Sequence, residues 1–272
     1  APMRLSTGFG GGKSHTLITL WHLARNVGQA TLGAELLPSA GRPARIAVAG
    51  IDGDKLGTLV CGRHGDVTTH AIWTELAYQL GGKDAYQKLL ELDDPHNVPD
   101  AGAFAHIMPP GPVLILLDEL VLYMGKLDAQ ANKALLAFTN QLVSTVTSRN
   151  QAVLVITDPA SQAAYAAEAE ALGKALTSAA SAAFLDQILG RKTGDFDPIG
   201  NEAPQVINRR LFQRVDKDAA HQAATEYYNA YQRVAAANPE LNPPEAAAND
   251  YANKRIVACY PVHPRLMDTA QQ

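Results

Sequence analysis

The chain has 272 residues, enough for one large domain or two smaller ones. Hydrophobic residues make up 47% and charged residues 18%, and 23 Lys and Arg against 27 Asp and Glu give a formal net charge of −4. That charge excludes a strongly basic chain of the kind that contacts nucleic acid broadly. No apolar run approaches the length of a membrane span, and no signal peptide pattern is found. We therefore expect a cytoplasmic protein without membrane contact.

Short apolar runs alternate with longer helical patterns through the first 160 residues. Strands are predicted at 3–7, 45–51, 113–117 and 152–157, and helices at 15–26, 69–80 and 128–149. The second helix is expected to end at the pair Gly81-Gly82. The apolar runs are short and well punctuated, which is typical of strands buried on both faces. This alternation predicts an α/β fold with a parallel sheet flanked by helices.

After residue 160 the pattern becomes mainly helical. Residues 160–189 are rich in alanine and are expected to be helical, and 190–204 are expected to form a loop. A short last strand is predicted at 205–208, followed by helices at 216–237 and 245–257. We therefore predict two parts, an α/β core at 1–160 and a mainly helical part at 161–272. The first strand begins almost at residue 1 and 260–272 has no obvious ending, so we expect a piece of a longer polypeptide.

A glycine-rich loop between the first predicted strand and helix is the strongest signal. Glycines let backbone N–H groups turn inward around phosphates. Lys13 would reach the terminal phosphates, Ser14 would offer its hydroxyl to Mg²⁺, and the helix from His15 would direct its positive end at the anion. The departure from the common phosphate-loop pattern is Thr7, where glycine is expected. An incidental Lys-Ser after a glycine loop is the alternative. The predicted ATP-binding residues are Gly8, Phe9, Gly10, Gly11, Gly12, Lys13, Ser14 and His15.

A pair of carboxylates follows the buried run at 113–117. In phosphate-loop enzymes an Asp at this position holds Mg²⁺, and an adjacent Glu can polarise the attacking water. Asp118 and Glu119 occupy these positions. The carboxyl ends of parallel strands meet at one edge of the sheet, so Asp118 and Ser14 are expected to share the metal. Acids also often follow strands for no catalytic reason. If the pair is functional, the Glu favours hydrolysis over transfer to a substrate hydroxyl.

Two further kinds of side chain complete the predicted site. Thr157 ends the next strand, where it would contact the γ-phosphate or orient the water, although a plain turn before Asp158-Pro159 explains it equally well. An arginine can stabilise charge on the transferred phosphoryl group, from the same chain or from a neighbouring subunit. We select Arg210, while a solvated surface role is the commoner one for any single arginine. The candidates are Arg149, Arg191, Arg209, Arg210 and Arg214.

Several segments together resemble a known family. The matching segments are 8–17 with 20–23, 72–82, 114–120 with Tyr123, 157–161, 209–212 and 260–264. They are similar to domain-of-unknown-function family 499, large prokaryotic AAA+-like ATPases, and the resemblance spans nearly the whole chain. It implies a P-loop NTPase fold of AAA+-like type with a helical lid, and a genomic setting in anti-phage defence islands beside DNA methyltransferases. It also implies phosphate and Mg²⁺ roles for Lys13 and Ser14, Mg²⁺ and water-activating roles for Asp118 and Glu119, and a sensor role for Thr157.

These observations predict a Mg²⁺-dependent ATPase that acts in a DNA-modification or phage-defence system. ATP is the expected ligand, and an arginine supplied by a neighbour would require a homo-oligomer or partner subunits. Nucleic acid is expected to take part only indirectly. The alternatives are a non-hydrolysing nucleotide switch or scaffold, a P-loop kinase and a direct nucleic-acid-binding module.

Overall fold

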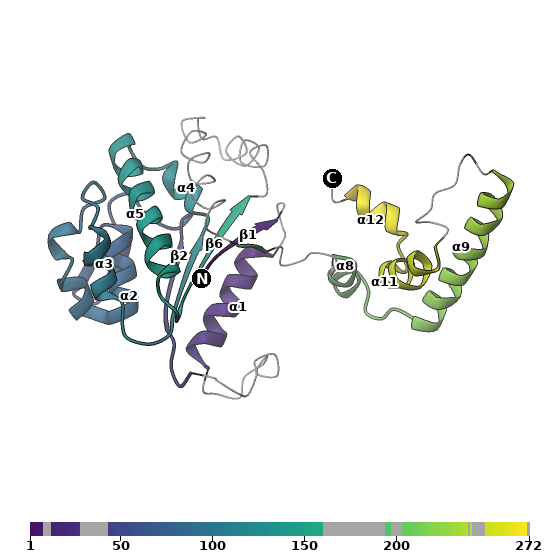
Figure 1. The fold of residues 1–272 in the computed structure, drawn as a ribbon, viewed down its shortest axis with the longest axis horizontal. Helices are drawn as coiled ribbons and strands as arrows, with labels where there is room; N and C mark the ends of the chain where they lie inside the picture. The colour runs from purple at the N-terminus through teal and green to yellow at the C-terminus, as the bar shows by residue number, and fades with distance from the viewer. Residues whose placement is uncertain are drawn as a thin grey trace. The chain divides into compact units, whose positions relative to one another are not determined.

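A computed structural model describes residues 1–7, 12–27, 43–159, 194–196, 203–238, 240 and 248–270. The chain divides into two compact units, Ala1–Pro198 and Ile199–Gln272, coloured from purple to green and from green to yellow in Figure 1. The predicted division at 160 differs from this one. The reason is that strand β7 (Gly194–Phe196) returns to the first unit and pairs with β1 (Pro2–Thr7).

The first unit is built on a five-stranded sheet in which every pair of neighbours is parallel. Its order is β2-β5-β6-β1-β7. The three strands not yet placed are β2 (Ala47–Asp52), β5 (Val113–Asp118) and β6 (Ala152–Pro159). The predicted α/β fold with a parallel sheet flanked by helices is confirmed. Because β6 lies between β1 and β5, the end of β6 also lies between the ends of those two strands.

Alternating side chains of the strands pack on opposite faces of the sheet, as the period of two requires. Ile115 and Leu117 of β5 belong to the large core under the helices of one face. Leu116 packs with Leu5 and Leu17 under α1 (Lys13–Arg25) on the other face. Figure 1 shows α1 on one side of the sheet, opposite α2 (Ile72–Gln87), α3 (Ala101–Ile107) and α5 (Ala129–Thr147). Burial on both faces explains the unbroken apolar run of β5.

Aromatic rings fill the large core between α2, α3 and α5. Trp73, Phe104 and Phe138 are each at most 2% exposed, and the Phe138 ring lies 5.5 Å from Trp73 and 5.0 Å from Phe104, centroid to centroid. Helix α5 begins at a side-chain cap, because Asp128 accepts hydrogen bonds from the backbone N–H groups of Gln130 and Ala131. The cap therefore fixes where α5 begins.

The helix stop predicted at Gly81-Gly82 coincides with a break in α2. Gly82 has φ 69° and ψ −159°, which is not helical, so α2 consists of two helical segments, the second of which continues to Gln87. Two other predicted elements differ from the structure. The strand predicted at 205–208 is wrong, because those residues lie in helix α8 (Ala203–Leu211). Pro204 stands in the first turn of α8, where proline is tolerated because no N–H partner is needed there. The last strand is instead β7, inside the segment predicted as a loop.

The second unit is helical in its described parts. Besides α8 it contains α9 (Lys217–Ala237), a π-helix η6 (Tyr251–Ile256), α11 (Val257–Cys259) and α12 (Pro264–Ala270). The helix predicted at 216–237 is confirmed. Ala224, Ala252 and Ile256 form a small core between α9 and η6. Across the described ranges of both units, no helix combines the length and the apolar character needed to cross a membrane.

Candidate functional site

Helix α1 begins at Lys13, soon after the end of β1. Gly12, the residue before it, has φ 75° and ψ 12°, a left-handed conformation that glycine adopts without strain. Gly12 has no side chain with which to cap the helix, and no acidic residue lies in the first turn of α1. The first backbone N–H groups of a helix have no partner inside it, so this terminus is suited to an anion. The predicted contacts Gly8, Phe9, Gly10 and Gly11 lie outside the described residues.

Thr157 joins the ends of β6 and β5 by two hydrogen bonds. Leu117 pairs with Ile156, so the next residues of the two strands lie side by side. The Thr157 hydroxyl donates to Asp118 Oδ1 at 2.5 Å and accepts from the backbone N–H of Glu119 at 3.0 Å. Thr157 is only 2% exposed. It therefore fixes both the Asp118 carboxylate and the backbone that carries the Glu119 side chain.

Glu119 has an unusual backbone conformation. Its φ of 49° makes it the one non-glycine residue with positive φ among those described. Such a conformation costs about 1–3 kcal/mol and persists only where the surroundings impose it. Here the Thr157 bond holds the Glu119 N–H, and Gly53 N–H donates to the Asp118 carbonyl at 2.8 Å. Strain of this kind is commoner at functional sites than elsewhere, and it lies at the residue expected to orient water.

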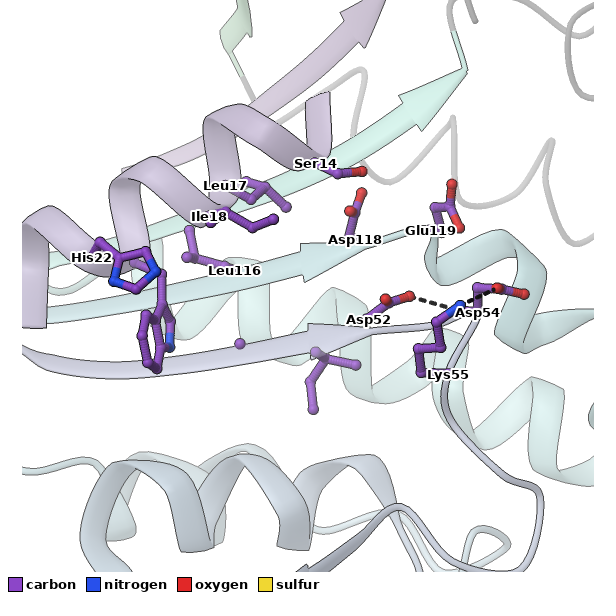
Figure 2. Close-up of a pocket in the computed structure, with 13 residues that line it drawn as sticks. Ser14, Leu17, Ile18, His22, Asp52, Asp54, Lys55, Leu116, Asp118 and Glu119 are labelled. Carbon is purple, nitrogen blue, oxygen red and sulfur yellow. Dashed lines mark hydrogen bonds and ion pairs between the residues drawn. The ribbon is translucent and has the colours of Figure 1, made fainter. Parts of the chain in front are cut away.

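A pocket of about 390 Å³ lies beside these residues, between α1 and the ends of β2 and β5. Figure 2 shows the Ser14 hydroxyl and the Asp118 carboxylate facing the same space. One wall is acidic and contains Asp52, Asp118 and Glu119, and the other is apolar and includes Leu17 and Trp21. The pocket therefore combines carboxylates that attract a cation with an open helix terminus that attracts an anion.

The side chains at this pocket fit a magnesium ion shared with phosphates. Mg²⁺ usually takes one or two carboxylates and fills its other positions with water and phosphate oxygens. Thr157 engages Asp118 Oδ1, and Oδ2 accepts no hydrogen bond from the described residues. Ser14 is exposed at the start of α1 and lines the same pocket. Among the described residues, no three His, Cys, Asp or Glu side chains gather as an all-protein metal site would require.

Asp52 is a site residue that the sequence interpretation missed. It ends β2 and is the register partner of Asp118, so the two carboxylates stand on adjacent strand ends. The Asp52 Oδ1 atom accepts the backbone N–H of Asp54 at 3.0 Å. A usable signal was present, because an acid directly follows the predicted strand at 45–51 as another follows the strand at 113–117. The same argument that selected Asp118 would have found Asp52.

Lys126 shapes the rim of the pocket from outside it. Its ammonium group donates to the backbone carbonyls of Gly53 and Leu56, each at 3.1 Å, and to that of Asp54. These carbonyls belong to the turn after β2, which brings Asp54 and Lys55 to the pocket. No sequence pattern marks such a lysine, since its partners are backbone atoms some 70 residues earlier.

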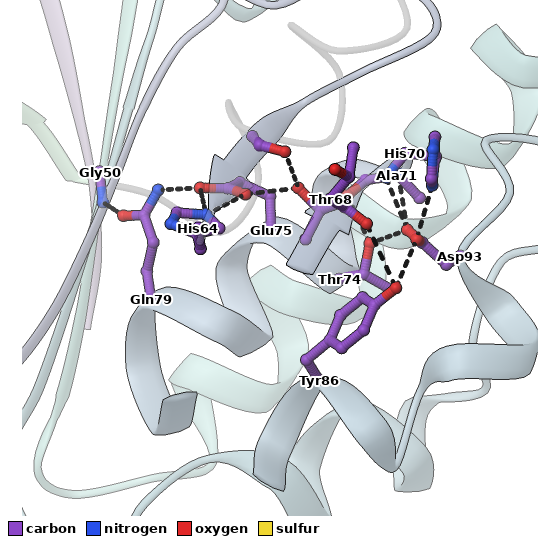
Figure 3. Close-up of polar contacts among 12 residues, drawn as sticks. Gly50, His64, Thr68, His70, Ala71, Thr74, Glu75, Gln79, Tyr86 and Asp93 are labelled. Carbon is purple, nitrogen blue, oxygen red and sulfur yellow. Dashed lines mark hydrogen bonds and ion pairs between the residues drawn. The ribbon is translucent and has the colours of Figure 1, made fainter. Parts of the chain in front are cut away.

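A buried polar network connects the pocket wall to the hairpin of β3 (Gly62–His64) and β4 (Val67–Thr69). Gly50 of β2 lines the pocket, and its N–H donates to Gln79 Oε1 at 2.7 Å. Figure 3 shows the next bonds: Gln79 Nε2 donates to Glu75 Oε1 at 2.7 Å, and His64 Nε2 lies 2.8 Å from Glu75 Oε2. Glu75 is 3% exposed. The network thereby ties the edge of the sheet to α2.

Asp93 organises the start of α2 in the same region (Figure 3). Its carboxylate accepts the backbone N–H of His70 at 2.7 Å, that of Ala71 at 3.1 Å and the Tyr86 hydroxyl at 3.0 Å, and it also bonds the Thr74 hydroxyl. Burial alone would raise the pKa of Asp93, but hydrogen bonds from Thr74, His70 and Tyr86 outweigh it and lower that pKa below its ordinary value.

We expect Asp93→Asn to lower the free energy of unfolding at pH 7 by about 2 kcal/mol, because the amide replaces an ionised acceptor of several bonds. Since the folded-state pKa is depressed, the carboxylate stabilises the fold above its unfolded-state pKa. That stability is lost as the pH falls through the folded-state value. The free energies of unfolding of wild type and of Asp93→Asn, measured in urea at a series of pH values, should therefore converge in acid. Exposed Asp84, also on α2, gives the matched control Asp84→Asn, expected to change little.

The predicted site residues fall into three groups. Asp118, Glu119 and Thr157 lie together, and Ser14 lines the same pocket. Lys13 and His15 share the first turn of α1 with Ser14, and the His15 side chain is exposed. Arg210 lies in the last turn of α8, in the second unit, and its catalytic role stays a prediction.

The fold and the site define an α/β protein whose parallel sheet carries acidic and hydroxyl side chains at its carboxyl edge. Comparison of the chain with protein-family models, with curated proteins and with solved structures gives no match.

Proposed function

We propose that the first unit binds ATP with Mg²⁺ and hydrolyses it, as an AAA+-like P-loop module. The observation that carries the proposal is the pair of hydrogen bonds by which Thr157 joins Asp118 and Glu119 at the pocket that Ser14 also lines. The N-terminus of α1, which no side chain caps among the described residues, lies beside the same pocket and would offer a place for phosphates. Both features lie at the carboxyl edge of a parallel sheet, where ligands of such sheets bind.

Each side chain has a distinct part in this proposal. Lys13 would neutralise charge on the terminal phosphates, and Ser14 with Asp118 would hold Mg²⁺, which lowers the charge that builds up on the phosphate oxygens. Glu119 would orient the attacking water and accept its proton. Thr157 would keep Asp118 and Glu119 in register. An arginine such as Arg210, from this chain or a neighbouring subunit, would stabilise the negative charge of the transition state.

The biological setting of the proposal rests on the family resemblance. The resemblance to prokaryotic ATPases of phage-defence islands leads us to propose a DNA-modification or defence system as the context. Homo-oligomers or partner subunits would supply the arginine if it acts in trans. A nucleotide switch that binds without turnover remains the alternative, and the turnover measurement separates the two.

The proposal is tested by measuring ATP binding and Mg²⁺-dependent phosphate release by the whole chain beside Lys13→Ala. Wild type is expected to bind and turn over ATP. Lys13→Ala is expected to weaken ATP binding by about 100-fold, because a charge-assisted contact to phosphate is lost. Exposed Lys88, at the C-terminal end of α2, provides the control Lys88→Ala with the same change of charge. Absence of nucleotide binding by wild type at saturating Mg²⁺ would overturn the proposal, and binding without release would favour the switch.

A further inference from the structure

A second pocket, of about 640 Å³, lies wholly within the helical unit. Its walls come from the end of α8, from the connection to α9 and from the first turns of α9, with one residue of α11. A volume in this range is typical of sites for small organic ligands. Asn208, Arg209, Phe212, Arg214 and Lys217 are among the residues that line it.

Three exposed cationic side chains line this pocket together with apolar ones. Arg209, Arg214 and Lys217 carry permanent positive charge, and no carboxylate lines the pocket with them. Within the described parts of the chain, none of these three side chains forms an ion pair. The nearest acid in the connection, Asp216, caps α9 through bonds from the backbone N–H groups of Asp218 and Ala219. Three cations that line one pocket with no carboxylate among its lining residues favour an anionic ligand.

One aromatic side chain narrows the chemistry of that ligand. Phe212 is half-buried and lines the pocket, where it offers a ring to a planar group. The neighbouring Asn208 has a structural part, because its Nδ2 atom donates to the carbonyls of Ala258 at 3.1 Å and Tyr260 at 3.0 Å and so ties α8 to the end of α11.

We propose that this pocket binds a nucleotide unit, with its phosphate on Arg209, Arg214 and Lys217 and its base against Phe212. Cations that track phosphate, combined with an aromatic ring for a base, are the common means of binding nucleotides without reading their sequence. The same chemistry is presented by a free nucleotide and by single-stranded nucleic acid. The net charge of −4 does not oppose this, because the cations are concentrated locally.

The test uses the whole chain carrying Lys13→Ala, so that the pocket of the first unit contributes little. Fluorescence anisotropy would be measured at low salt with labelled single-stranded oligodeoxyadenosine and with labelled ADP. At least one probe is expected to bind, and Arg214→Ala with Lys217→Ala should weaken that binding about tenfold or more. Arg233→Ala with Lys254→Ala removes the same charge from exposed positions outside the pocket and should weaken it less than about twofold.

Two conservative variants guard against loss of folding. Arg214→Gln keeps most of the side-chain length but removes the charge. It should also weaken binding of the probe, as the double variant does. Phe212→Leu keeps apolar volume but removes the ring, so it should weaken binding of the labelled probes severalfold. The concentration of inorganic pyrophosphate that displaces them should stay as before, because the phosphate contacts are kept. If labelled ADP binds more tightly, the ligand is a free nucleotide. If the oligodeoxyadenosine binds more tightly, the ligand is single-stranded nucleic acid.

Failure of both probes to bind overturns the proposal, as does an equal loss of binding in the pocket variants and in the charge-matched control. Because Lys13 is already replaced, these outcomes are independent of whether the first unit is an ATPase.

Discussion

Replacing Glu119 by Gln is expected to reduce ATP turnover by about 100-fold or more while nucleotide binding persists. The amide has nearly the shape of the carboxylate but cannot accept the proton of the attacking water, so the loss falls on the chemical step. The backbone bond from Glu119 N–H to Thr157 does not depend on this side chain, so the local structure should be kept. Phosphate release and equilibrium ATP binding, measured on the same preparation, separate the two effects.

The matched control for this prediction is Glu91→Gln, which makes the same chemical change at an exposed residue of η2 (Leu90–Leu92). It should leave turnover and binding at wild-type values. Turnover by Glu119→Gln within a few-fold of wild type would remove Glu119 from the proposed mechanism. Equal losses of binding and turnover would instead assign Glu119 to ligand or metal binding.

The Gly53→Ala substitution is expected to destabilise the first unit by about 3 kcal/mol and to impair the site at the same time. A Cβ at this position would lie 2.4 Å from the Glu119 carbonyl oxygen and 3.1 Å from that of Asp118. These are backbone atoms, so no side-chain rotation relieves the overlap. The turn after β2 must move away from Asp118 and Glu119, which breaks the Gly53 N–H bond to the Asp118 carbonyl.

Urea unfolding and ATP binding of Gly53→Ala test this expectation together. Gly102→Ala is the control, because Gly102 lies inside α3 and its added methyl group would meet only the Asp100 side chain, at 3.2 Å. Alanine is the better helix former, but the Asp100 carboxylate that caps α3 must shift slightly, so this variant should stay within about 1 kcal/mol of wild type in stability. A Gly53→Ala protein as stable as wild type would show that the turn has room to adapt.

The position of Asp118 beside Thr157 could be foreseen from the sequence. Both follow short apolar runs, and the ends of parallel strands meet at one edge of the sheet. The bond between them was not foreseeable, because it requires β6 to be the direct neighbour of β5 in the correct register. Strand order is set by packing of the helices on the sheet, and local sequence does not encode it.

Other parts of the site left no local signal. Lys126 holds the turn after β2 through backbone carbonyls, which carry no residue identity to recognise. The strand β7 is three residues long and its pairing with β1 depends on the sheet already being formed. The error at 205–208 has a similar origin, since two neighbouring apolar residues are too few to distinguish a strand from a short helix.

The bond between Gln79 and Gly50 bears on association between copies of the protein. In the described sheet β2 is an outer strand, and an outer strand presents unpaired backbone groups to any chain that could add beside it. Gln79 already occupies the Gly50 N–H, and Gln79 is itself held by buried Glu75. A strand from a second molecule would have to displace this pairing before it could extend the sheet. The network that supports the pocket wall therefore also protects this edge from intermolecular strand addition.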